Sequence, residues 1–277
     1  MSAAREGGPG AGAPLFELRG VSKAFGTQVI FRDVNLRIDA GQTLTLIGES
    51  GCGKTLLLKM LVGLIEPDEG EVRFRGRPIA QMDDAELLDL RSHAGYVFQS
   101  DALFDSLPVR ENVAYGLVEH TDLDEEAVTA RVIECLRHVG LSERILDAYP
   151  VDLSGGMRRR VSLARTIALG PEVIIYDEPM AGLDPQNITR IGRLIERLSD
   201  ELGTTSILAT HEIVTAFAIS DRIAMFDGGT VAYTGTPDEM RAHPAPAVHA
   251  FIDEALRVVD ELAALAAEAE SNAPVPR

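Results

Sequence analysis

The chain has 277 residues, of which 45% are hydrophobic and 25% charged, a composition typical of a globular protein and unlike that of a disordered chain. At roughly 150 residues per domain, this length allows one large domain or two small ones. Lys and Arg total 26 against 43 Asp and Glu, and the net charge of -17 argues against a nucleic acid partner, because binding phosphate backbones needs a basic surface. Two cysteines are too few for a disulfide framework or a four-cysteine zinc site.

The N-terminal segment predicts neither export nor membrane insertion. Residues 1–13 are rich in Gly, Ala and Pro and lack the charged start and apolar run of a signal peptide, so we expect a flexible N-terminus. The best apolar stretch, Leu56–Ile65, covers about ten residues and contains Lys59, whereas a membrane span needs roughly 20. If the protein works at a membrane, we therefore expect a partner to hold it there.

The first hundred residues predict short strands around one strand, loop and helix unit. Apolar runs with turn residues between them predict strands at residues 15–18, 29–31, 34–38 and 43–47. A glycine cluster follows, and a helical pattern then covers residues 54–64 and ends before Pro67. A hairpin-like stretch is predicted at residues 70–77, and Asp83 or Asp84 is expected to cap a short helix.

The middle of the chain, from about residue 100 to residue 170, is predicted to be an inserted helical subdomain. Pro108 opens one helix, and Asp122 or Asp124 caps another that stops near Gly140. Beyond it, apolar runs at residues 173–176, 206–208 and 223–226 alternate with helical patterns at residues 185–202 and 212–219. This alternation predicts a mostly parallel sheet with helices on both faces, and hence an α/β fold.

The C-terminal part predicts a helical extension over residues 246–277. Thr236 and Glu239 form a capping box pattern that opens a short helix before it. Apolar residues then recur at helical spacing from Val248 to Ala266. That apolar stripe must be covered, either by the rest of the same chain or by a partner subunit.

A complete phosphate-binding loop pattern lies between a predicted strand and a predicted helix, in the run Gly48, Glu49, Ser50, Gly51, Cys52, Gly53, Lys54 and Thr55. Its glycines let backbone N–H groups face phosphate oxygens, to which Lys54 adds a positive charge. Thr55 can offer its hydroxyl to Mg²⁺. The alternative is a glycine-rich turn with a solvated lysine.

Two further motifs extend this site. The strand at residues 173–176 ends in Asp177 and Glu178, which a parallel sheet places at its carboxyl edge beside the phosphate loop. There Asp177 can reach the metal shell, and Glu178 can orient and polarise a water for attack on the terminal phosphate. Small residues in Leu153-Ser154-Gly155-Gly156-Met157 lead into a helix and suggest a second anion-binding terminus, although spacing alone favours an ordinary N-cap role for Ser154.

The order of these motifs resembles the nucleotide-binding subunit of an ATP-binding cassette (ABC) transporter. The resemblance covers roughly residues 15–240 and includes Gln99 in Val97-Phe98-Gln99-Ser100, Asp184 in Ala181-Gly182-Leu183-Asp184, and His211 in Ala209-Thr210-His211-Glu212. It implies an ABC domain over residues 14–245. In that domain a RecA-like, mostly parallel sheet carries an antiparallel β subdomain and the helical subdomain.

The resemblance also implies roles for individual residues, with ATP and Mg²⁺ as cofactors. Two cassettes would pack head to tail, so that the signature residues Ser154, Gly155 and Gly156 of one subunit close on the ATP held by Lys54 of the other.

Within one subunit, Gln99 would contact the γ-phosphate and Mg²⁺, Glu178 would activate water, and His211 would contact the γ-phosphate. Phe25 would stack on adenine, and Asp184 would lie at the dimer seam. Taken singly, Gln99, His211 and Phe25 also fit ordinary structural roles.

Met157 stands where the signature usually ends in Gln, and this departure narrows the resemblance. Together with residues 102–107, 119–121 and 236–241, it resembles the ATPases of Mce-associated lipid transporters, including the Mla phospholipid system and its solvent-tolerance relatives. The resemblance implies a peripheral ATPase on the cytoplasmic face of the inner membrane. Its partners would be integral-membrane permease subunits and an Mce-domain lipid-binding protein.

Three apolar residues after Gln99, namely Leu103, Phe104 and Leu107, would line the groove for the permease or be buried in the helical subdomain. The main alternative is the ATPase of a polar amino acid or other small-solute importer, whose catalytic motifs would be the same. A non-transport ABC protein fits less well with a single cassette of charge -17, and a monomeric P-loop kinase leaves the signature and His211 unexplained.

Overall fold

Two β-sheets and a group of helices make up the part of the chain that the computed structural model describes, residues 14–246 and 248–253. The first sheet is antiparallel, with the order β2-β1-β4-β5. It consists of β1 (Phe16–Phe25), β2 (Gln28–Ile38), β4 (Glu69–Phe74) and β5 (Arg77–Pro78). It corresponds to the predicted short strands, although β1 and β2 are longer than expected.

The second sheet has the order β10-β9-β3-β8-β7-β6, and all its pairs are parallel except β9 with β10. Its strands are β3 (Thr43–Gly48), β6 (Ala94–Val97), β7 (Val173–Asp177), β8 (Thr205–Ala209), β9 (Arg222–Asp227) and β10 (Thr230–Gly235). The pattern analysis missed β6 and β10, because both are edge strands without a continuous apolar run. The predicted mostly parallel α/β architecture is nevertheless present.

Helices cover both faces of this sheet, as predicted. On one face, α1 (Lys54–Leu61) packs with Val173 and Ile175 of β7 against the antiparallel sheet. On the other face, Ile174 and Tyr176 of the same strand pack with α6 (Pro185–Leu202). The alternation along β7 thus divides the interior into two apolar layers. A short helix, α7 (Ile213–Ile219), packs beside α6 and β3.

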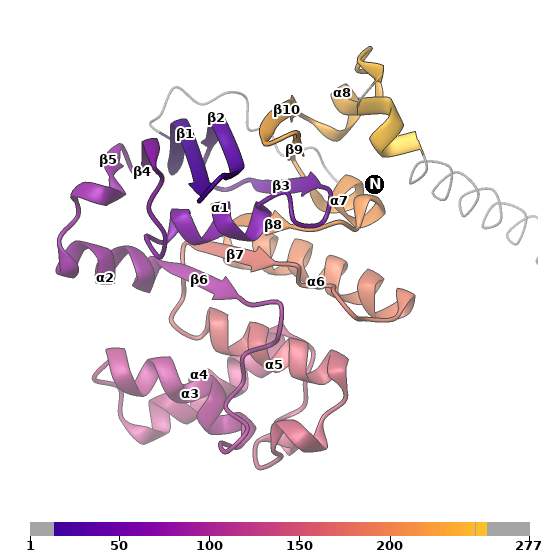
Figure 1. Ribbon diagram of the computed structural model, residues 1–277. Coiled ribbons are helices and arrows are strands. Elements are labelled where there is room, and N and C mark those ends of the chain that lie inside the picture. Colours follow the sequence, from indigo (N-terminus) through magenta and orange to yellow (C-terminus); the bar gives the residue numbers. More distant parts are fainter. Residues whose placement is uncertain (1–13, 247, 254–277) are drawn as a thin grey trace, which may run out of the picture.

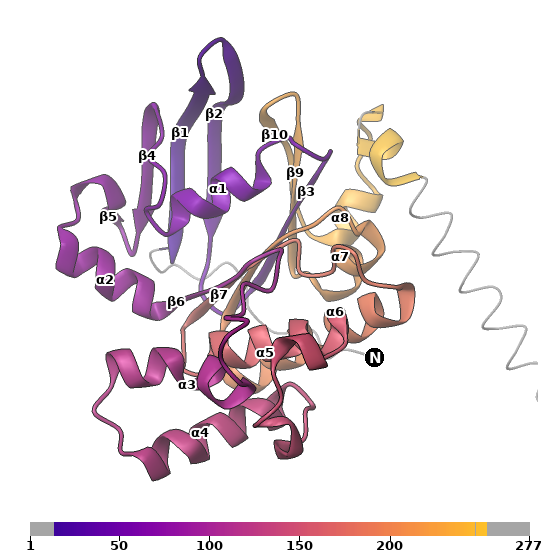
Figure 2. The ribbon, with the colours of Figure 1, turned by 60° about the horizontal axis from the view of Figure 1, so that its bottom comes forward.

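The predicted helical segment contains α3 (Val109–His120), α4 (Glu125–His138) and α5 (Gly155–Ile167), while α2 (Asp84–His93) precedes it. Asp124, and not Asp122, caps α4 by accepting a hydrogen bond from Ala127 N. Figures 1 and 2 both show α3, α4 and α5 on the side of the parallel sheet opposite the antiparallel one. The N-terminus of α5 nevertheless lies close to the N-terminus of α6, because Gly156 is a neighbour of Asn187.

The described part of the C-terminal extension begins by packing on its own chain. After α8 (Pro237–Arg241), which has the predicted capping box of Thr236 and Glu239, Val248 and Ile252 are buried in one cluster with Phe217 and Met240. The remaining stripe to Ala266 and the predicted flexible residues 1–13 lie outside the described residues. No helix within the described ranges is long and apolar enough to span a membrane.

Candidate nucleotide site

The phosphate loop is shaped by glycines between β3 and α1. Gly53, the residue before α1, has φ 102°, and a Cβ built there would lie 2.6 Å from atoms of Ile30 and Phe31. Only glycine fits both the left-handed backbone and the close approach of the antiparallel sheet. The loop and the first residues of α1 line a cavity, so the free N–H groups of this helix start are available to an anion bound there.

Lys54 folds back over this loop instead of extending into solvent. Its Nζ donates hydrogen bonds to the carbonyl oxygens of Gly48 at 2.8 Å and Glu49 at 3.1 Å, and the residue is buried. The same Nζ lies 3.8 Å from Oε1 of Glu178. The ammonium group is thus held between the loop and the carboxylate, where a phosphate group of a nucleotide is expected.

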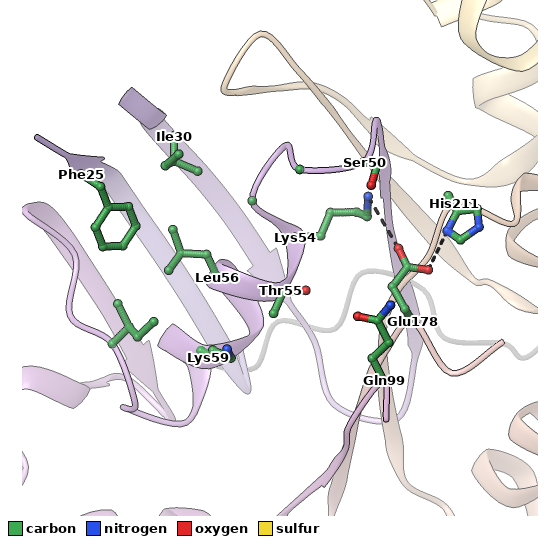
Figure 3. Close-up of a pocket in the computed structure, with 13 residues that line it drawn as sticks. Phe25, Ile30, Ser50, Lys54, Thr55, Leu56, Lys59, Gln99, Glu178 and His211 are labelled. Atoms are coloured by element: carbon green, nitrogen blue, oxygen red, sulfur yellow. Dashed lines mark hydrogen bonds and ion pairs between the residues drawn. The ribbon is translucent and has the colours of Figure 1, made fainter. Parts of the chain in front are cut away.

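Glu178 and His211 meet because β8 lies between β3 and β7 in the sheet. The residues that follow the parallel strands β7 and β8 therefore emerge side by side. Nδ1 of His211 lies 2.8 Å from Oε2 of Glu178, so His211 donates when that nitrogen carries the proton. Glu178 has φ 48°, a strained backbone that a hydrogen bond from its N–H to Ala209 O helps to hold. Figure 3 shows the two carboxylate oxygens directed at Lys54 and His211.

Asp177 is oriented by two hydroxyl groups on opposite sides. Thr55 Oγ1 donates to one carboxylate oxygen at 2.7 Å, and the Tyr96 hydroxyl donates to the other at 3.1 Å, while Asp177 itself is only 4% exposed. Burial, and then the charge of Asp177, raises the pKa of Tyr96, so its phenol stays protonated as a donor. Tyr96 was not among the predicted site residues, because it lies on β6, the strand that the pattern analysis missed.

The oxygen-rich neighbourhood of Thr55, Asp177 and Gln99 fits Mg²⁺, which binds through one or two carboxylates and hydroxyls together with phosphate oxygens. Thr55 and Asp177 already share a hydrogen bond, and Thr55 and Gln99 line one cavity together. The ion would neutralise charge on the terminal phosphates when bound.

One cavity of about 470 Å³ joins most of the predicted residues. Its lining includes Phe25, Ser50, Gly51, Gly53, Lys54, Thr55, Gln99, Glu178 and His211. Three loop residues do not line the cavity, namely Gly48, Glu49 and Cys52. Asp177 does not line it either, but it accepts a hydrogen bond from Thr55, which does. Phe25 lies at the end away from Glu178, is 55% exposed and shares that end with Ile30 (Figure 3). The cavity thus has an apolar end suited to a base and a charged end suited to phosphates.

The remaining predicted residues form a separate cluster. Ser154 caps α5 by accepting a hydrogen bond from Met157 N, and Asp184 caps α6 by accepting from Asn187 N. A Cβ at Gly156 would lie 3.2 Å from Oδ1 of Asn187, so the two helix starts are neighbours. Neither lines the cavity of the same chain. Asn187, which joins the two motifs, was missed because no motif marks it.

Comparison with known proteins gives consistent results. Residues 31–181 match the family described as ABC transporter. The intermembrane phospholipid transport system ATP-binding protein MlaF of Escherichia coli K12 is 37% identical over 241 residues, which cover 87% of this chain and 89% of MlaF. The sulfate/thiosulfate import ATP-binding protein CysA of Bordetella pertussis is 39% identical over 243 residues, covering 86% of this chain and 67% of CysA.

Solved structures are similar over most of the chain. The dimeric ATP-binding cassette MJ0796 in a post-hydrolysis state with ADP and Pi has a TM-score of 0.73 and 32% identity, and covers 80% of this chain and 98% of its own. The structure of cbiO1 from Clostridium perfringens, part of the transporter complex cbiONQ, has a TM-score of 0.77 and 28% identity, with coverage of 90% and 98%.

Proposed function

The chain belongs to the ABC transporter family as an ATP-hydrolysing subunit, and from this premise we propose that the transporter it drives moves phospholipid. The observation that carries the proposal is the 37% identity to MlaF over 89% of that protein. Met157 in the signature and the segments 102–107 and 236–241 support it, since they resemble ATPases of Mce-associated systems. In such a system, phospholipid transport driven by ATP hydrolysis maintains the lipid asymmetry of the outer membrane.

We assign the chemistry of hydrolysis to the charged end of the cavity. Lys54 and the N–H groups at the start of α1 hold the phosphates, and Glu178 accepts the hydrogen bond of the attacking water. His211 holds Glu178 in place and reaches the same end of the cavity. Ser154, Gly155 and Gly156 would come from a second copy, since none of them lines the cavity of their own chain.

ABC cassettes dimerise and act with membrane permeases, so a peripheral position is expected. We place this chain on the cytoplasmic face of the inner membrane, held by its permease, with an Mce-domain lipid-binding protein in the same complex. Phe104 supports a permease contact, because it is 41% exposed and its ring contacts that of the exposed Tyr115 in a tilted arrangement, at a centroid distance of 4.8 Å. Leu103, by contrast, packs against the helical core.

Phe104→Asp is expected to reduce copurification of the permease several-fold, because a charge replaces one of the two side chains of the exposed aromatic patch formed by Phe104 and Tyr115. Leu123→Asp is the matched control, since Leu123 is similarly exposed, at 47%, but lies in the connection between α3 and α4. Equal recovery of the permease with both variants would argue against the patch.

The substrate is tested by purifying the tagged chain from membranes and identifying proteins and lipids by mass spectrometry. We expect a permease, an Mce-domain protein and bound phospholipid. Recovery of a sulfate-binding or other solute-binding receptor without an Mce-domain protein would favour the alternative, an importer of sulfate, a polar amino acid or another small solute, which the similarity to CysA makes the main competitor.

Phe25→Ala is expected to raise the KM for ATP roughly 5- to 30-fold and to leave kcat nearly unchanged. Stacking on a base contributes about 1 to 2 kcal/mol, and Phe25 lies at the end of the cavity away from Glu178, to which we assign hydrolysis. Phe25→Trp should retain the wild-type KM because it keeps an aromatic face. A kcat loss with unchanged KM in Phe25→Ala would contradict the assignment to the base.

A further inference from the structure

The segment after β6 that carries Gln99, here called the Gln99 loop (residues 98–102), has a strained backbone. Asp101 and Ala102 have φ values of 59° and 50°, in the left-handed region that non-glycine residues rarely adopt. Two such residues in succession persist only where the surroundings hold them in place. The contacts that hold this loop are therefore informative about how Gln99 is positioned.

Those contacts come from arginines of α5. Arg159 donates from Nη1 to Phe98 O and from Nη2 to Gln99 O, both at 2.7 Å, and its Nη1 lies 3.0 Å from Oδ1 of Asp101. Arg165 donates to Ala102 O at 2.8 Å. One helix thus holds the carbonyl oxygens of three of the five loop residues and the carboxylate of a fourth.

Burying the charged side chain of Arg159 at this position is energetically unfavourable. Its side chain is 4% exposed, and within the described part of the chain its Nε has no hydrogen-bond partner. Burial lowers the pKa of Arg159 and raises that of Asp101, so the protein environment disfavours both charges. A well-packed apolar residue would generally stabilise such an interior site as well or better. An apolar residue could not replace the guanidinium group in one respect. The guanidinium group binds two successive carbonyl groups at once and so fixes the backbone between them.

The same helix begins at the signature. Ser154 caps α5, and Arg159 lies five residues further along it, whereas Gln99 lines the nucleotide cavity of its own chain. We propose that Arg159 is a positioning residue that locks the Gln99 loop to α5, so that docking of Ser154 on the partner's nucleotide also sets Gln99 in its own site. This rests on the proposed roles of Gln99 and Ser154 and adds the link between them.

Arg131, which lies on α4, provides a matched control because it binds the opposite end of α5. Its Nε donates to Ala168 O and its Nη2 to Ile167 O, both at 2.9 Å. Its guanidinium group therefore also holds two successive carbonyl groups, through Nε and Nη2, but at the end of α5 remote from Ser154. Replacing either arginine should remove a purely structural contribution to α5. Only the replacement of Arg159 should release the Gln99 loop.

The test compares Arg159→Gln and Arg131→Gln in the assembled transporter. Hydrogen exchange of backbone amides in residues 98–104 should become roughly tenfold faster in Arg159→Gln and stay at the wild-type rate in Arg131→Gln. The kcat of Arg159→Gln should fall roughly tenfold with the KM for ATP within about threefold. Unchanged exchange in Arg159→Gln, or equal acceleration in both variants, would overturn the proposal.

The route through Gln99 is tested with the double variant. Gln99→Ala should lower kcat, and adding Arg159→Gln should lower it no further, because both remove the same placement of Gln99. Additive losses, or wild-type kcat in Gln99→Ala, would reduce Arg159 to a structural residue and overturn the link. Neither result bears on the phospholipid assignment, which the copurified components decide separately.

A second variant covers the case in which Arg159→Gln does not fold. Arg159→Met combined with Asp101→Asn removes both members of this ion pair, so that neither charge is left uncompensated. Thermal unfolding near the wild-type Tm with accelerated exchange in residues 98–104 supports the proposal. A folded double variant with wild-type exchange contradicts it.

Discussion

Lys54→Ala is expected to lower ATP hydrolysis by about 10²- to 10³-fold, the loss typical of removing one preorganised group that stabilises developing charge. The ammonium group is held in place by two loop carbonyls and lies beside Glu178, so no other side chain of the described chain occupies the same position. Phosphate release measured with the purified transporter gives kcat, and a fluorescent nucleotide gives the affinity, which should also fall.

Lys59→Ala is the matched control for this result. Lys59 contributes a second ammonium group to the lining of the same cavity, but it lies away from Glu178 in Figure 3. Its removal should cost clearly less activity than removal of Lys54. Similar losses in both variants would mean that only the overall positive charge of the cavity matters, and not the contacts of Lys54 with the loop.

Glu178→Gln is expected to lower kcat by roughly 10²- to 10⁴-fold while ATP still binds, because the amide keeps the shape of the side chain but cannot accept a proton from water. Since hydrolysis is what ends the closed state, an ATP-bound dimer should accumulate, and sedimentation with and without ATP would detect it. Adding Ser154→Arg to this variant should prevent the dimer, because the signature turn could no longer close on the partner's nucleotide.

Glu212→Gln is the control for the Glu178 result. Glu212 Oε1 lies 3.5 Å from Nε2 of His211, so it is a second carboxylate beside the same imidazole, but it does not line the cavity. Its variant should retain activity within a few-fold of the wild type. Wild-type turnover in Glu178→Gln would show that the carboxylate assignment is wrong.

Local patterns determined much of the chemistry and of the fold class. The phosphate loop, the apolar strand that ends in Asp177 and Glu178, and the alternation of strands and helices predicted a phosphate and Mg²⁺ site on an α/β sheet. The resemblance to ABC transporter subunits added ATP and the family. The family, the fold and the cofactors are confirmed. These predictions succeed because glycine conformation, strand burial and helix capping depend on residues close together in the sequence. The roles of individual site residues stay predictions.

Only the tertiary structure decided which distant residues meet. Strand order places β8 between β3 and β7 and brings His211 to Glu178, and the edge strand β6 brings Tyr96 to Asp177 across 81 positions of sequence. Arg159 and the Gln99 loop are similarly 60 positions apart. A periodic pattern shows which face of an element is buried and not which element covers it, so such contacts follow from strand order and helix packing alone.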